Sequence, residues 1–139
     1  MAFYDGTDSI SFNDHFFNGN IEKAYKESVN MGFHPSSGKK TGLQATAAHE
    51  LGHKLTADVA VKMGKTRFSI DSAAKEIVEK ARKDTGHKGV IKLAEKISGY
   101  ATYSNAEAIA EAVCDVYCNG GKAKKESIAI VKVIDSYLK

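Results

Sequence analysis

Several features that would exclude an ordinary globular domain are scarce or missing in this chain. It has one proline in 139 residues and no repeat or low-complexity tract, so neither disorder nor a repeat array is indicated. No apolar run approaches the length of a membrane span, and residues 1–6 lack the basic start and apolar core of a signal peptide. We therefore expect one cytoplasmic domain, residues 1–139, with no membrane contact.

Cysteine is also rare, and no disulfide framework is needed because 42% of the residues are hydrophobic, enough for a core. Cys114 and Cys118 are four residues apart on a predicted helix, where their Cβ atoms start about 5–6 Å apart, beyond comfortable disulfide geometry. We expect both to be reduced, packed thiols, with zinc ligation as the alternative.

Positive charge is neither strong nor concentrated. The formal net charge is +3, and the lysine blocks are no longer than Lys39-Lys40 and residues 122–125. Lysines spread in this way are typical of solvated helix faces rather than of a nucleic-acid surface. The sequence therefore predicts no nucleic-acid partner.

The apolar spacing predicts a mostly helical chain with a short β segment at its start. Alternation of Ile10 and Phe12 with serines predicts two strands within residues 1–13, around a turn. Helical periodicity and capping signals then predict helices at about residues 20–31, 41–63, 71–85, 88–98, 104–118 and 122–139. The expected fold class is α+β, with a small N-terminal β-hairpin or sheet and about six helices.

The second predicted helix carries the motif His49-Glu50-Leu-Gly-His53. Two histidines four residues apart lie one above the other on a helix, so both can reach one metal ion. Glu50 lies about 100° further round and can contact a water beside that ion. The arrangement predicts a hydrolytic zinc site. The alternative is that the two histidines are merely packed or solvated and bind no metal.

Catalytic zinc usually has three protein ligands, so a third ligand is expected on another element. Glu107 and Glu111 share one face of a predicted helix rich in Ala, Ile and Val, and buried carboxylates need partners. We predict that Glu107 binds the metal and that Glu111 accepts the free ring N–H of one histidine. Alternatively, Glu107 forms a capping box with Ser104, and Glu111 is a surface carboxylate.

The motif and the segment Tyr100-Ala-Thr-Tyr-Ser-Asn-Ala-Glu-Ala-Ile-Ala-Glu-Ala112 together resemble the gluzincin metalloproteases. Similar members are the catalytic domain of anthrax lethal factor and small toxin-like or phage-encoded relatives. In that group a Tyr lies seven residues before the ligand Glu, and x-x-Ala-Glu-Ala follows the ligand. The similarity covers about half of the chain, residues 41–54 and 100–117.

The resemblance implies a minimal zincin-like fold and one zinc ion held by His49, His53 and Glu107. It also implies that Glu50 is the general base and that Tyr100 assists the transition state. From the residues alone, Tyr100 is a packed aromatic and Tyr103 is a competing candidate.

The expected reaction is peptide-bond hydrolysis in a peptide or protein substrate. Residues Ser9, Ile10 and Ser11, if they form a sheet edge beside the cleft, would bind an extended peptide by main-chain hydrogen bonds. The alternatives are a non-catalytic zincin-like module of a phage or mobile-element protein, and hydrolysis of a non-peptide amide. The other histidines, His15, His34 and His87, are interpreted as loop or surface residues.

Overall fold

A computed structural model of the chain describes residues 2–4, 10–12 and 20–139, and only the backbone of the first two segments. Six α-helices are described: α1 (Ile21–Asn30), α2 (Gly42–Lys62), α3 (Ile70–Thr85), α4 (Val90–Ile97), α5 (Asn105–Asn119) and α6 (Lys125–Leu138). Two short 3₁₀ segments, η2 (Tyr100–Tyr103) and η3 (Gly120–Lys122), precede and follow α5. These bounds agree closely with the helices predicted from periodicity.

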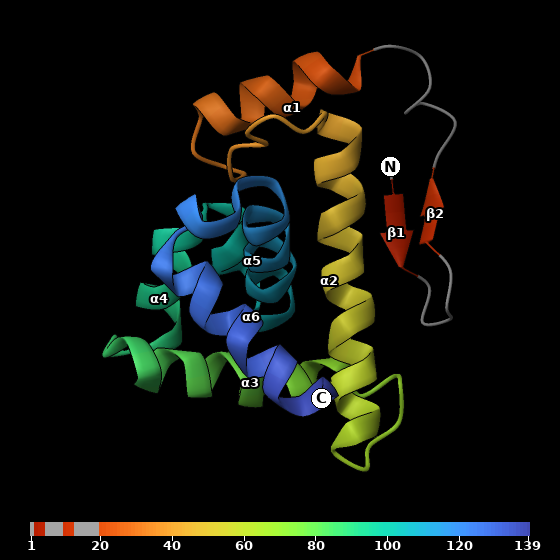
Figure 1. The fold of residues 1–139 in the computed structure, drawn as a ribbon, viewed down its shortest axis with the longest axis vertical. Coiled ribbons are helices and arrows are strands. Elements are labelled where there is room, and N and C mark those ends of the chain that lie inside the picture. The colour runs from red at the N-terminus through yellow and green to blue at the C-terminus, as the bar shows by residue number, and fades with distance from the viewer. Residues whose placement is uncertain (1, 5–9, 13–19) are drawn as a thin grey trace.

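The hydrophobic core lies between α2, α3, α4, α5 and α6. Its largest fully buried side chains are aliphatic and come from the last four of these helices: Ile77, Leu93, Ile97, Ile109, Ile130 and Ile134. The apolar stripe of α3 (Ala74, Ile77, Val78 and Ala81) is entirely buried. In Figure 1, α2 stands as one long helix beside the group formed by α5 and α6, and α1 lies across the end where α2 begins.

Two N-terminal strands, β1 (Ala2–Tyr4) and β2 (Ile10–Phe12), pair antiparallel with Phe3 opposite Ser11. They lie along α2 on the side away from α5, with β1 next to the helix (Figure 1). A pair of three-residue strands is too small to form a packed layer, and the described core is built from helices alone.

The predicted α+β class is therefore wrong, and the domain is helical. Alternating apolar residues indicated strands locally, but alternation does not reveal whether further strands exist to extend the sheet. The zincin-like fold implied by the resemblance is not confirmed. No helix among the described residues is long and apolar enough to cross a membrane.

Two independent sets of hydrogen bonds stabilise the start of α2. Thr41 and Gln44 form a capping box, in which the Thr41 hydroxyl accepts from the Gln44 N–H and the Gln44 side chain accepts from the Thr41 N–H. The Glu22 carboxylate of α1 accepts from the Gly42 N–H at 2.7 Å. An anionic group at a helix N-terminus also interacts favourably with the helix dipole. The helix that carries the metal motif is thus anchored at its first turn.

Close contact between α2 and α5 places the motif against the predicted third ligand. At Gly52 a Cβ atom would lie only 2.6 Å from the Cα of Ala110, so the two helix backbones nearly touch there. Gly52 lies one residue before His53, and Ala110 lies between Glu107 and Glu111. Packing at this point brings both histidines of α2 to the face of α5 that carries both carboxylates.

Candidate metal centre

The structure brings His49, His53 and Glu107 together. One ligand atom from each lies within 4.8 Å of the others, and among the described residues these three form a group that could hold a metal ion. Nε2 of His49 is 3.0 Å from Oε2 of Glu107, and Nε2 of His53 is 3.2 Å from Oε1. Atoms that bind one metal ion at about 2.0–2.1 Å in a tetrahedral arrangement lie about 3.3 Å apart, so these separations are compatible with a shared ion.

Glu107 has the surroundings of a ligand. Its Oε2 atom is buried and has no hydrogen-bond partner among the described residues, although Nε2 of His49 is 3.0 Å away. The two atoms form an ion pair that does not meet hydrogen-bond geometry. A buried carboxylate oxygen without a hydrogen bond is costly, and a cation shared with His49 would offset that cost.

The capping-box alternative for Glu107 applies to its backbone. The Ser104 hydroxyl accepts from the Glu107 N–H at 3.1 Å and caps α5, as predicted. The Glu107 carboxylate faces the two histidines of α2 instead of completing the box. Ser104 therefore fixes the start of α5 and leaves the Glu107 side chain available to the site.

Opposite charges in the cluster shift two pKa values in opposite directions. Burial lowers the pKa of His49, but contacts with Glu107 and Glu111 outweigh it and raise that pKa to about 9. Burial raises the pKa of Glu107, but the contacts with His49 and His53 outweigh it and lower that pKa to about 2. Glu107 is therefore a carboxylate at neutral pH, the form that binds a metal ion.

Glu111 lies behind His49, where the sequence predicted a carboxylate that orients a ring. Its side chain is 1% exposed, and Oε2 accepts a hydrogen bond from Nδ1 of His49 at 3.0 Å. Burial raises the pKa of Glu111, but the contacts with His34 and His49 lower it overall. The surface alternative is wrong, because Glu111 is among the most buried side chains of the domain.

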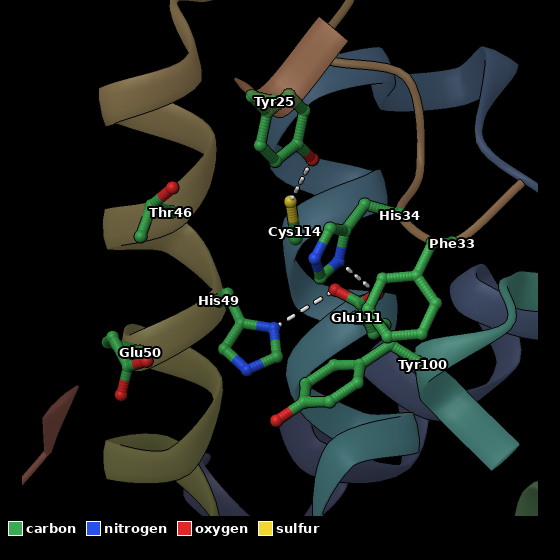
Figure 2. A pocket seen from close by; sticks show the side chains of 9 residues that line it. All are labelled: Tyr25, Phe33, His34, Thr46, His49, Glu50, Tyr100, Glu111 and Cys114. Atoms are coloured by element: carbon green, nitrogen blue, oxygen red, sulfur yellow. Dashed lines mark hydrogen bonds and ion pairs between the residues drawn. The ribbon is translucent and has the colours of Figure 1, made fainter. Parts of the chain in front are cut away.

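A cavity of about 250 Å³ opens beside His49. Figure 2 shows the nine residues that line it, contributed by α1, α2, α5, η2 and the loop after α1: Tyr25, Phe33, His34, Thr46, His49, Glu50, Tyr100, Glu111 and Cys114. Most of the lining surface is apolar. The predicted base, Glu50, is buried and lines this cavity together with Tyr100.

The two candidate tyrosines differ in their surroundings. The ring of Tyr100 lies 5.7 Å from that of His49, whereas the residue Tyr103 is 68% exposed and packs on the outer side of Tyr100 at 5.0 Å. Burial and the neighbouring Glu107 carboxylate raise the pKa of Tyr100. Its phenol is therefore protonated at neutral pH and can donate a hydrogen bond.

His34 contributes to the site, which its loop position did not suggest. It lies in the loop after α1 and outside the three-residue metal group, yet Nδ1 of His34 is 2.7 Å from Oε1 of Glu111. The Ser98 hydroxyl donates to the same oxygen at 2.9 Å. The sequence did hold a sign that Glu111 has a further partner. A fully buried carboxylate needs more than the single hydrogen-bond donor that was predicted for Glu111.

Among the described residues, none of the remaining predicted residues belongs to the three-residue metal group. Ser9 is outside the described residues, and only the backbone of Ile10 and Ser11 is described, as part of β2. Cys114 and Cys118 are free thiols, as predicted, and the Cys114 thiol donates to the backbone oxygen of Ala45 at 3.3 Å.

No protein-family model, curated protein or solved structure matches this chain. The resemblance to gluzincins therefore rests on the two segments quoted above, and the chemistry has to be argued from the site itself.

Proposed function

We propose that the chain is a zinc-dependent metallopeptidase with a gluzincin-type ligand set. The supporting observation is a group of three converging ligands, His49, His53 and Glu107, next to a cavity that Glu50 also lines. Structural zinc sites are usually closed by four protein ligands, whereas catalytic sites use three and leave a position open. Within the described residues this group has three members, which favours catalysis over a purely structural role.

Zinc is the metal that fits this donor set. Two imidazole nitrogens and one carboxylate are ligands that zinc commonly accepts, and the separations suit a tetrahedral ion. Nδ1 of His49 is engaged by Glu111, so Nε2 is the atom that His49 presents. When bound, zinc would act as a Lewis acid that polarises the scissile carbonyl and makes water more acidic.

Glu50 and Tyr100 would carry the proton transfers and charge stabilisation. Glu50 is largely buried and lines the same cavity as His49, and its side chain would accept a proton from the attacking water and deliver it to the leaving amine. Tyr100 would donate its O–H to the developing oxyanion, and its raised pKa keeps that proton in place at neutral pH. The substrate class that we propose is a peptide or protein.

The test combines metal analysis with cleavage of a diverse peptide library, read by mass spectrometry. We expect one zinc per chain in the wild type, and Glu50→Gln should keep zinc but lose cleavage by about 10²–10⁴-fold, the usual contribution of a general base. His53→Ala should lose both zinc and activity. Glu27→Gln, an exposed position on α1, is the matched control and should behave as wild type.

Each outcome separates the hypotheses. Cleavage retained by Glu50→Gln would refute the assignment of the base. If the wild type binds one zinc per chain but cleaves no peptide, the non-catalytic module is favoured. If the wild type binds no zinc, the proposed function is refuted.

A further inference from the structure

The Glu111 carboxylate joins three elements that are distant in the sequence. Oε1 accepts from Nδ1 of His34 at 2.7 Å and from the Ser98 hydroxyl at 2.9 Å, and Oε2 accepts from Nδ1 of His49 at 3.0 Å. Figure 2 shows the His34 and His49 rings both directed at this carboxylate. The orientation of the Glu111 side chain therefore depends on His34 as much as on Ser98.

That orientation matters because it determines which nitrogen of His49 faces Glu107. A histidine that donates its Nδ1–H to a carboxylate has a fixed ring position and presents Nε2 to a metal. If Oε1 lost the His34 donor, only the Ser98 hydroxyl would hold it, and the carboxylate could rotate and weaken the hydrogen bond that holds the His49 ring. The geometry of the metal cluster would then be less well defined.

His34 is itself held in a fixed position. Its ring stacks on Tyr25 with a centroid separation of 5.6 Å and an interplanar angle of 11°. The Tyr25 hydroxyl donates to the carbonyl of the buried Pro35 at 2.9 Å. These contacts place the Nδ1 atom of His34 without help from the metal.

The same loop is bonded to the segment that carries Tyr100. The Gly99 N–H donates to the Gly32 carbonyl at 2.9 Å, and the Tyr100 N–H donates to the Phe33 carbonyl at 3.1 Å. The Phe33 ring packs on Tyr100 at 5.2 Å. Residues 32–35 therefore contact both the Glu111–His49 pair and the tyrosine beside it.

We propose that His34 is a positioning residue of the metal site, which acts through Glu111 to hold His49 in its ligand orientation. This inference rests on the proposed zinc function. It predicts that removing the Nδ1 donor of His34 weakens zinc binding although His34 is not a ligand. It also predicts that restoring a donor at that atom restores the affinity.

Two substitutions separate the donor from the ring. His34→Phe keeps a ring that can stack on Tyr25 but removes the donor. His34→Asn removes the ring but places an amide nitrogen at the position of Nδ1, because both atoms are bonded to Cγ. His87→Phe is the matched control, since His87 also contacts a buried glutamate, Glu126, at 2.8 Å, but lies between α3 and α4 outside the cluster.

The first readout is zinc affinity, measured by competition with a chromophoric chelator, with thermal unfolding as the check on folding. We expect His34→Phe to bind zinc at least tenfold more weakly, the usual effect of losing a supporting hydrogen bond around a metal site. His34→Asn should stay within about threefold of wild type, and His87→Phe should match wild type. Wild-type affinity in His34→Phe, or equal losses in His34→Phe and His34→Asn, would overturn the proposal.

The second readout does not depend on zinc. Proton–nitrogen NMR of the imidazoles in zinc-free protein should show a protected Nδ1–H signal of His49 in the wild type and in His34→Asn. The signal should be lost by exchange in His34→Phe, and its persistence there would refute the role of His34. If the wild type binds no zinc, the proposed function fails while this measurement still decides the inference; if His34→Phe does not fold, His34→Gln, whose amide lies one carbon further out, removes the same donor.

Discussion

Substitution of Gly52 by alanine tests whether the close approach of α2 and α5 brings together the three candidate metal ligands, His49, His53 and Glu107. The added Cβ would lie 2.6 Å from the Cα of Ala110 and 3.3 Å from the Cβ of Val113. Carbon atoms in favourable contact are about 3.5–4.0 Å apart, so the helices must separate locally by about 1 Å. Because the nearest atom belongs to the backbone, no side-chain rotation relieves the overlap.

The expected change in the free energy of unfolding of Gly52→Ala is the sum of two opposing contributions. Alanine is favoured over glycine inside a helix by about 1 kcal/mol. Overpacking costs about 1–3 kcal/mol, and the backbone contact places Gly52→Ala at the upper end. We expect the free energy of unfolding to fall by about 2 kcal/mol, which lowers the melting temperature by roughly 7 °C for a chain of this length.

Zinc binding should be more sensitive than stability. Ligand distances in a metal site tolerate about 0.2 Å, much less than the expected helix displacement, so the affinity of Gly52→Ala for zinc should fall at least tenfold. The assays are thermal unfolding and chelator competition. Gly121→Ala is the control, because a Cβ there would meet no atom within 4 Å. A Gly52→Ala protein that matches Gly121→Ala in both assays would refute the helix-contact argument.

Two further predictions concern the helix start and pH. Thr41→Ala removes the hydroxyl that accepts from the Gln44 N–H and should lower the free energy of unfolding by about 1 kcal/mol, measured by urea titration; an unchanged midpoint would contradict the capping role. The pKa of His49 is raised from 6.5 to about 9, so its stabilisation of zinc-free protein is full below pH 6.5 and lost as pH rises through 9. The melting temperature should fall over that range, and less steeply in Glu107→Gln; equal slopes would count against the pair.

Local signals in the sequence predicted the helices well. Ser104 is a side-chain cap in the structure, and the apolar stripe of α3 is buried. These features depend on neighbours within about four residues, where helix geometry leaves few alternatives. The fold class failed for the opposite reason, since the alternation at Ile10 and Phe12 could not show that the two described strands pair only with each other and form no packed layer.

The residues of the site also differ in how well the sequence predicts them. The spacing of His49 and His53 on one helix was enough to predict a shared ion, because their proximity follows from the helix itself. The apolar neighbours of Glu107 and Glu111 in the sequence indicated that both carboxylates need partners, but they did not identify all of those partners. His34 lies 77 residues from Glu111 along the chain, and no local pattern connects the two.

By itself, the sequence determined the helices, the Ser104 cap and the pair of histidines on α2, since these follow from backbone geometry and short-range hydrogen bonds. Only the tertiary structure decided that Gly52 packs against Ala110, that Glu107 faces both histidines, and that His34 supports the Glu111 carboxylate. Those contacts depend on how separate helices and loops pack, and packing is a property of the whole chain.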